Sequence, residues 1–255
     1  MTALHARVAH HARLTPDAPA VRCGDLVMGY GELDRRAEAF VPLLRSLGIG
    51  PETPVGVHLR RCPELPVALL AVLKAGGYCV PLDPAYPPER LRSVMEEVAA
   101  PVALTLRALR EGLPRHESAV VCLDEHDAPP SGGPAPRPPA AAHPQALAWA
   151  SYTSGSTGRP KGVMLSHGPL ASLAEGIADR LELTPGDRVL QFASIGFSVA
   201  AEEIFSTWHA GACLVLDPEE SLADAARGPQ QRPSTVRADA RAAQTSQIVT
   251  PEPAP

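Results

Sequence analysis

Short apolar runs that alternate with helical patterns constrain the fold of this chain more than any other feature. Between residues 30 and 123 the spacing of apolar residues switches repeatedly between the two periods that mark helices and strands. The expected elements are a helix at 30–47, a strand at 54–59, a helix at 64–75, a strand at 78–82, a helix at 87–98, and strands at 102–105 and 119–123. Strands separated by helices of this length need crossover connections, so we predict an α/β fold with largely parallel sheets.

A proline-rich stretch at 128–144 interrupts this alternation, and its composition cannot build a core. The alternation then resumes, with expected strands at 147–153, 163–165, 188–193 and 213–216 and expected helices at 167–183 and 199–208. We therefore predict two related α/β units: a first subdomain at 1–127, a linker at 128–144, and the start of a second subdomain at 145–217. Residues 218–255 have almost no apolar periodicity, which predicts a disordered tail.

The segment from Tyr152 to Val163 carries the strongest chemical signal in the chain. It reads Tyr-Thr-Ser-Gly-Ser-Thr-Gly-Arg-Pro-Lys-Gly-Val. Glycines let backbone N–H groups curl around an anion, and a lysine adds a mobile positive charge for phosphate oxygens. It is not a Walker A loop, because Lys161 follows a proline and precedes a glycine. We predict a triphosphate-binding loop; a flexible glycine-serine turn between strands is the alternative.

The expected phosphate ligands are the hydroxyls, glycines and lysine of this segment. They are Thr153, Ser154, Gly155, Ser156, Thr157, Gly158 and Lys161. Thr157 and Lys161 are the two from which we expect the largest catalytic contribution.

This segment resembles the phosphate-binding motif of the adenylate-forming enzymes, and among them the amino-acid adenylation domains of nonribosomal peptide synthetases. Two earlier stretches match in the order that family shows. Residues 73–91 are similar to its second motif almost residue for residue, and 29–33 resemble the first, with Gly29 where Ser or Thr is usual. The resemblance extends from the N-terminus to about Asp217 and implies the N-terminal part of the adenylate-forming fold, with 218–255 off the family's pattern.

The resemblance implies ATP-dependent activation of a carboxylic acid, an amino acid or a related acid, as an acyl-adenylate. Mg²⁺ would bridge the phosphate oxygens, as hard cations do. A carrier protein bearing phosphopantetheine would be the partner by family. Two alternatives stay open: a fragment of an acyl-CoA ligase, and a non-catalytic module that binds a nucleotide or a partner.

Residues 191–205 resemble the family's fourth motif, Phe-Asp-x-Ser-x-x-Glu-x-Phe, and here Ser198 stands where amino-acid-activating members carry the aspartate. That aspartate would bind the substrate's ammonium group, a contact worth roughly 1.5–3 kcal/mol. The predicted acid-binding residues are Phe197, Ser198 and Glu202. Glu202 either restores part of the missing charge or is a solvated helix position. The substrate is then a non-amino acid, or the site has decayed.

The family's later motifs, for the adenine, the ribose and the C-terminal lid with its lysine, are not found in these 255 residues. We therefore expect a truncated chain that is inactive and marginally stable on its own.

Composition excludes several other classes. A net charge of −5 and a pI near 6.0 argue against a nucleic-acid surface, and the longest apolar run, 67–73, is too short to cross a membrane. His5, His10 and His11 suggest a solvated helix face rather than a metal site. The five cysteines are scattered and predict small buried side chains in a reducing cytoplasm, with none acting as a nucleophile.

Overall fold

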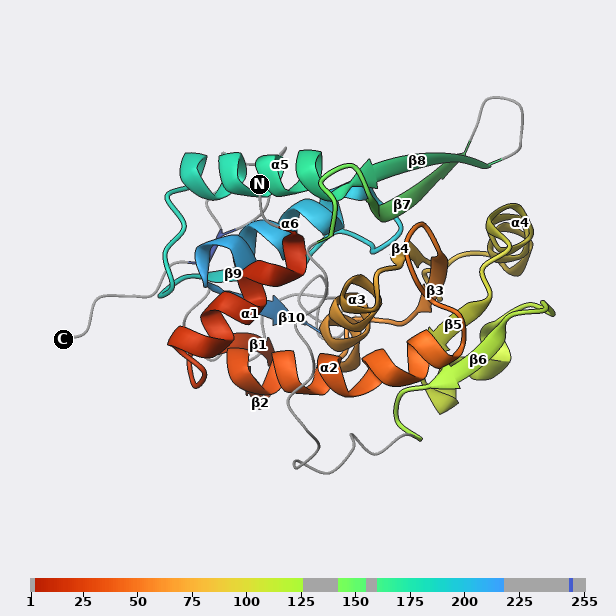
Figure 1. Cartoon of the computed structure of the whole chain (residues 1–255), viewed down its shortest axis with the longest axis horizontal. Coiled ribbons are helices and arrows are strands. Elements are labelled where there is room, and N and C mark those ends of the chain that lie inside the picture. Colours follow the sequence, from red (N-terminus) through yellow and green to blue (C-terminus); the bar gives the residue numbers. More distant parts are fainter. Residues whose placement is uncertain (1–2, 126–141, 155–159, 218–247, 250–255) are drawn as a thin grey trace, which may run out of the picture.

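The computed structural model describes residues 3–125, 142–154, 160–217 and 248–249, and its strands form two sheets (Figure 1). The larger sheet has the order β6-β5-β3-β4-β7-β8. Its strands are β3 Pro54–His58, β4 Tyr78–Pro81, β5 Val102–Thr105, β6 Ala119–Cys122, β7 Leu147–Ser154 and β8 Pro160–Ser166. All neighbours pair in parallel except β7 and β8, which form an antiparallel hairpin. The predicted parallel α/β architecture is confirmed.

The smaller sheet has the order β11-β9-β10-β1-β2. Its strands are β1 Pro19–Cys23, β2 Leu26–Gly29, β9 Arg188–Leu190, β10 Cys213–Leu216 and β11 Ile248–Val249. β1 lies parallel to β10, with Val21 opposite Leu214. The two sheets therefore do not divide at 128–144, because each one takes strands from both sides of the predicted linker.

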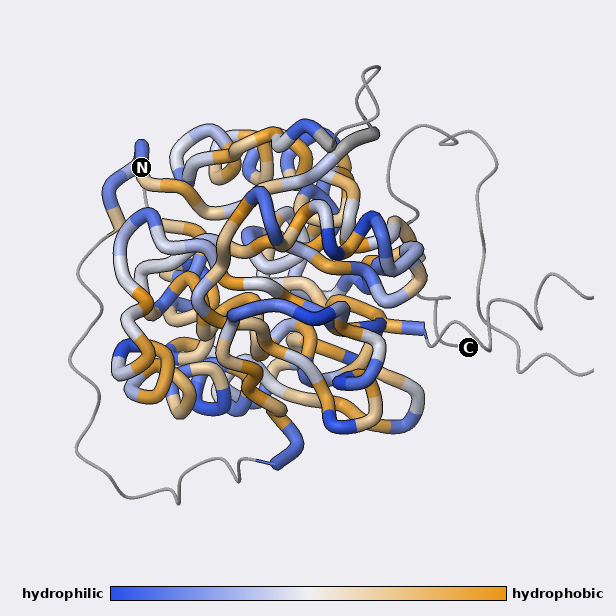
Figure 2. Tube along the Cα trace, turned by 90° about the vertical axis from the view of Figure 1, so that its right-hand side faces the viewer, coloured by the Kyte–Doolittle hydropathy of each residue, from blue (hydrophilic) through white to orange (hydrophobic). Residues whose placement is uncertain are grey.

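The helices are α1 Leu4–Leu14, α2 Tyr30–Ser46, α3 Glu64–Ala75, α4 Pro88–Val98, α5 His167–Arg180 and α6 Ser198–Ala210, with a 3₁₀ turn at Arg107–Gly112. α2 and α6 contact the smaller sheet, while α3 and α5 contact the larger one, so a helical layer lies between the sheets (Figure 1). α4 covers the opposite face of the larger sheet, where Leu91 and Val94 pack with Val80. Hydrophobic and hydrophilic stretches alternate along the described part of the trace (Figure 2).

The second motif makes the turn from α3 into β4. Every residue from Leu65 to Ala75 is buried, as a central helix of the layer requires. Gly76 ends the helix with a φ of +103°, a conformation that favours glycine. The N–H of Gly77 then returns to the carbonyl of Val72 at 3.1 Å, and Tyr78 begins the sheet pairing by donating to Thr53 at 3.0 Å.

The expectation of a solvated histidine face on α1 is wrong for His5. His10 is exposed, but the His5 side chain is 3 % exposed and meets the ring of His167 edge-on at 5.7 Å between centroids. The sequence of this segment does not show that α5 covers one side of α1. Among the described residues no group of three or more His, Cys, Asp or Glu side chains could hold a metal ion.

All five cysteines are free thiols, and Cys79, Cys122 and Cys213 are buried as expected, whereas Cys23 and Cys62 are half-buried. Burial raises the pKa of each of these thiols, that of Cys62 to about 12. Within the described ranges, no helix has the length and apolar character needed to cross a bilayer.

Candidate functional site

The predicted phosphate segment lies at the end of the β7–β8 hairpin. The two strands pair along their whole length, from Leu147 opposite Ser166 at one end to Ser154 opposite Pro160 at the other. In this register Thr153 lies opposite Lys161. The backbone thus brings Thr153, Ser154 and Lys161 together across the two strands. The remaining predicted ligands, Gly155, Ser156, Thr157 and Gly158, lie outside the described residues.

Lys161 is exposed on β8, which is the edge strand of the larger sheet among the described strands. A lysine that is to meet a soluble anion must be accessible in this way. The next residue, Gly162, lies directly under the ring of Tyr152, because a Cβ atom added there would be 3.0 Å from Tyr152 Cζ. Burial is the main cause that raises the pKa of Tyr152 to about 12, so the phenol is neutral at ordinary pH. The close approach of the Tyr152 ring therefore explains the glycine at position 162, where a larger side chain would collide with the ring.

Residues 191–198, the first part of the stretch that resembles the fourth motif, follow β9. A buried carboxylate organises them. Glu203 on α6 is 2 % exposed. Its Oε2 accepts hydrogen bonds from Gln191 Nε2, Phe192 N and Ala193 N, each at 3.1 Å. Burial raises the pKa of Glu203, while these hydrogen bonds and nearby Arg61 lower it. The predicted strand at 188–193 ends at Leu190 because Gln191–Ala193 turn toward this carboxylate.

Arg61 holds the same segment from the other side. Its Nε donates to the backbone oxygen of Gln191 at 2.9 Å and to Gln191 Oε1 at 3.0 Å, and Nη2 donates to the Phe192 carbonyl. Sequence reasoning identified Glu203 as a motif position without a role and did not identify Arg61. The match to the motif was the available signal for Glu203, whereas no local pattern pointed to Arg61.

The structure brings the three predicted acid-binding residues to the start of α6. Phe197 precedes the helix and is 52 % exposed, Ser198 is its first residue, and Glu202 follows one turn later. Residues four apart on a helix share a face, so Ser198 and Glu202 are neighbours. Both are half-buried, and the restoration of part of the missing charge by Glu202 stays a prediction.

Residues of the second motif contact both segments. Arg90 Nη2 donates to the Tyr152 carbonyl in β7 at 2.9 Å. The Ser194 hydroxyl donates to the carboxylate of Asp83. The sequence indicated the second motif but not these contacts, which join positions far apart in the chain.

The model of the AMP-binding enzyme family matches residues 8–231, most of the chain. The chain belongs to the AMP-binding enzyme family. It is 42 % identical over 221 residues to phosphinothricin tripeptide synthetase PhsC of Streptomyces viridochromogenes, covering 86 % of this chain and 20 % of that protein. It is 40 % identical over 222 residues to chondramide synthase cmdD of Chondromyces crocatus, covering 86 % of this chain and 6 % of that synthase.

Solved structures give the same result for the fold. The nonribosomal peptide synthetase FmoA3 with AMPPNP bound superposes with a TM-score of 0.76 at 30 % identity, over 91 % of this chain and 23 % of that one. Its form with α-methyl-L-serine-AMP also gives 0.76, at 31 % identity, over 85 % and 24 %. The architecture is thus that of the N-terminal subdomain of peptide-synthetase adenylation domains. The chain spans a fifth or less of the length of the two curated relatives.

Proposed function

We propose that this chain supplies the phosphate-binding and acid-binding segments of an adenylation domain, which activates an amino acid or a related carboxylic acid as an acyl-adenylate for nonribosomal peptide synthesis. The observation that carries the proposal is the β7–β8 hairpin, which sets the exposed Lys161 opposite Thr153 at the end of a glycine- and hydroxyl-rich segment. The FmoA3 structures with AMPPNP and with an aminoacyl-AMP support the choice of nucleotide and of reaction.

The chemistry brings together two anions, a carboxylate and the α-phosphate of ATP, so charge neutralisation and alignment are the main tasks of the catalyst. Lys161 and Thr157 would neutralise and orient the β- and γ-phosphates, with Thr153, Ser154, Gly155, Ser156 and Gly158 completing the predicted set of ligands. Mg²⁺ bound to phosphate oxygens would supply further positive charge. The residues present fit this task, since the exposed Lys161 lies opposite Thr153 in the backbone register of the hairpin.

The choice of acid depends on the first turn of α6. Ser198 offers a hydroxyl where amino-acid-activating members of the family carry a carboxylate, so selection for an ammonium group falls by about ten- to a hundredfold. The half-buried Glu202 next to it is the available replacement for the charge. We therefore propose either a non-amino carboxylic acid or an amino acid held through Glu202. ATP–pyrophosphate exchange with matched pairs of acids, with and without the α-amino group, distinguishes the two.

The partner that would accept the acyl group is a carrier protein with phosphopantetheine, and we propose a cytoplasmic location for the reaction. The alternatives are a module that binds nucleotide without turnover and part of an acyl-CoA ligase. The adenine, ribose and lid motifs are not among these 255 residues. We therefore propose that the 255 residues bind nucleotide but do not complete adenylation by themselves.

Calorimetric titration of the chain with AMPPNP and Mg²⁺ tests the nucleotide site. Lys161→Ala removes a charge-assisted contact of roughly 1.5–3 kcal/mol, so the affinity should fall about ten- to a hundredfold. Arg107→Ala, which removes an exposed cation from the 3₁₀ turn, is the matched control and should leave affinity unchanged. Equal affinities for Lys161→Ala and the parent chain would refute the proposal.

A further inference from the structure

We propose that Asp83, Tyr86 and Arg90 are positioning residues that couple the β7–β8 hairpin to the acid segment, residues 191–198. The proposal rests on the proposed function, because the hairpin carries the nucleotide ligands and the acid segment leads into the acid-binding turn. The eight residues from Asp83 to Arg90, here called the bridging segment, run from the end of β4 into α4.

Arg90 forms the contact with the hairpin. Its guanidinium donates to the Tyr152 carbonyl at 2.9 Å, next to the first predicted phosphate ligand, Thr153. The same guanidinium lies over the ring of Tyr86, with Cζ 3.8 Å from the ring centroid. A cation held over an aromatic face is attracted by the ring electrons, so the position of Arg90 depends on that of Tyr86.

Tyr86 forms the contact with the acid segment. A Cβ atom added at Gly196 would fall 2.0 Å from the Tyr86 hydroxyl oxygen, so the phenol is packed against the Gly196 backbone. That hydroxyl is buried and has no hydrogen-bond partner within the described part of the chain. Its position is therefore set by packing on both sides, by Arg90 over the ring and by Gly196 at its tip.

Asp83 makes a second contact with the acid segment and holds the bridging segment itself. Its carboxylate accepts from the Ser194 hydroxyl and, through Oδ1, from the backbone N–H of Ala85 at 2.9 Å. The N–H of Tyr86 returns to the Asp83 carbonyl at 2.9 Å. The bridging segment is thus a hydrogen-bonded turn rather than a loose linker, and a shift at one end is transmitted to the other.

The consequence is energetic coupling between the two ligands. A nucleotide that fixes the hairpin also fixes Tyr152, and through Arg90 and Tyr86 it restrains Gly196 just before Phe197 and Ser198. Coupling of this kind is reciprocal, so the acid must restrain the hairpin by the same factor. Reporter amides are available in the acid segment, since the N–H groups of Ala193, Gly196 and Phe197 are all hydrogen-bonded.

Amide hydrogen exchange of the ligand-free chain tests the contact itself. Arg90→Met removes the bond to Tyr152 and the cation over Tyr86, and should speed exchange at Ala193, Gly196 and Phe197 by threefold or more. Arg92→Met, an exposed position on the same helix, is the matched control and should change none of them. Faster exchange in β7 and β8 alone, with the acid segment unaffected, would overturn the proposal.

The second arm adds AMPPNP with Mg²⁺ and measures the same amides. In the parent chain and in Arg92→Met the nucleotide should slow their exchange, and in Arg90→Met that slowing should be lost even at saturation. Undiminished slowing in Arg90→Met would refute the coupling. If AMPPNP does not bind the parent chain, the proposed function fails, while the ligand-free arm still decides whether the bridging segment connects the two sites.

A pair of substitutions at the other end keeps the test independent of Arg90. Gly196→Ala forces the Tyr86 ring to move and should speed exchange at the hairpin amides around Tyr152. In a Tyr86→Ala background the added methyl has room, so Gly196→Ala should cause little further change. Additive effects of the two substitutions would show that Tyr86 does not transmit the shift.

Discussion

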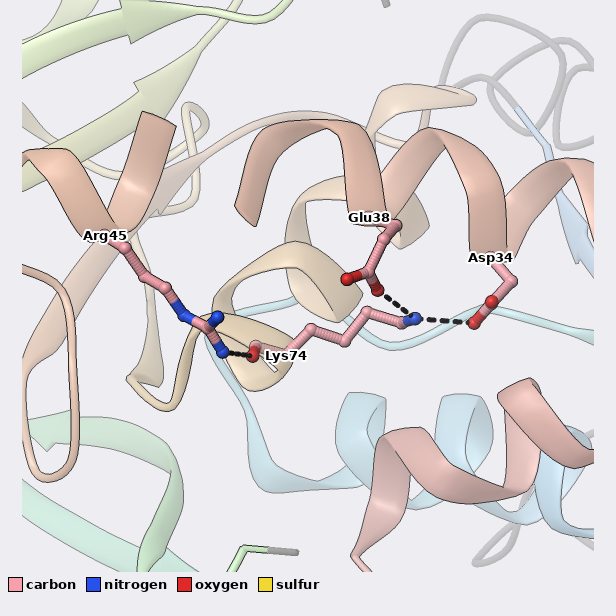
Figure 3. Close-up of polar contacts among 4 residues, drawn as sticks. All are labelled: Asp34, Glu38, Arg45 and Lys74. Atoms are coloured by element: carbon pink, nitrogen blue, oxygen red, sulfur yellow. Dashed lines mark hydrogen bonds and ion pairs between the residues drawn. The ribbon is translucent and has the colours of Figure 1, made fainter. Parts of the chain in front are cut away.

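The ammonium nitrogen of Lys74 lies 2.6 Å from Glu38 Oε2 and 2.8 Å from Asp34 Oδ1, so a lysine of the second motif joins α3 to α2 (Figure 3). The Lys74 side chain is 3 % exposed, and the side chains of Asp34 and Glu38 are 25 % and 16 % exposed. Arg45 adds a hydrogen bond to the Lys74 carbonyl at 3.1 Å. Charge on one helix is therefore matched by charge on its neighbour within the layer between the sheets.

Lys74→Met should lower the free energy of unfolding by about 3 kcal/mol, because it leaves two carboxylates close together without their cation. Denaturant unfolding followed by circular dichroism measures the loss. Combining Lys74→Met with Asp34→Asn and Glu38→Gln removes the unpaired charges and should recover part of it.

The control is Arg107→Met. Arg107 pairs with Glu125 on the surface at 3.6 Å, where the arginine side chain is 79 % exposed, so its loss should cost less than about 1 kcal/mol. Equal losses for the Lys74 and Arg107 variants would show that the buried pair contributes no more than a surface pair.

The buried pair His5 and His167 predicts a pH dependence of stability. Burial lowers the pKa of His5 to about 3 and that of His167 to about 4, from an ordinary value of 6.5. At a pH between these lowered pKa values and 6.5, the two histidines bind protons in the unfolded chain but not in the folded chain. The stabilisation is therefore complete above pH 6.5 and is lost as the pH falls toward 4, with a slope of up to about 1.4 kcal/mol per pH unit for each histidine.

Denaturant unfolding of the parent chain and of His5→Phe between pH 7.5 and 5 measures this slope. The variant should show a shallower dependence, because one of the two groups no longer titrates, whereas the exposed His10→Gln should keep the parent slope. The other histidines whose pKa is lowered by burial are common to all three chains and cancel in the comparison. Parallel pH curves for His5→Phe and the parent would count against a neutral buried pair.

Glu203 provides a test of hydrogen bonding against charge burial. Glu203→Ala leaves the N–H groups of Phe192 and Ala193 and the Gln191 amide without their acceptor, which should cost about 2–4 kcal/mol. Glu203→Gln keeps one acceptor oxygen for them and no longer buries a charge, so it should cost less than about 1 kcal/mol. Unfolding free energies of the two variants separate these effects.

Glu202→Ala is the matched control on the same helix. We expect its effect on stability to be below about 1 kcal/mol, since among the described residues the hydrogen bond to Glu202 is accepted by its carbonyl, from Ser206 at 2.6 Å, and the substitution keeps that carbonyl. If Glu203→Gln is as damaging as Glu203→Ala, the ionised form is essential, and the hydrogen bonds alone do not explain the organisation of the acid segment.

The elements that sequence predicted best are those whose signals are local. The helix at Glu64–Ala75 was predicted with its observed bounds, because its apolar spacing and the glycines after it lie within one short stretch. The pairing of β1 with β10 could not be predicted, because Val21 and Leu214 meet only when the whole helical layer has formed. Burial of His5 was missed for the same reason.

The candidate site divides in the same way. Because each motif is contiguous, the sequence carries the prediction of which residues bind the nucleotide and the acid. The bond from Arg90 to Tyr152 and the contact of Tyr86 with Gly196 join different motifs, and no local pattern carries that information.

Two glycines should respond in opposite directions to the same added methyl group. At Gly77 a Cβ atom would lie 2.8 Å from the Thr53 carbonyl oxygen and 2.8 Å from Ile49 Cγ2. The carbonyl belongs to backbone that begins a sheet pairing and cannot easily move, so Gly77→Ala should destabilise the chain by about 1–3 kcal/mol. At the exposed Gly176 inside α5 nothing lies within 4 Å of the added atom, and alanine lowers the entropy cost of forming the helix. Gly176→Ala should therefore stabilise by about 0.5–1 kcal/mol. Denaturant unfolding of both variants measures the two signs, and a stabilising Gly77→Ala would mean that the turn from α3 into β4 is looser than these contacts require.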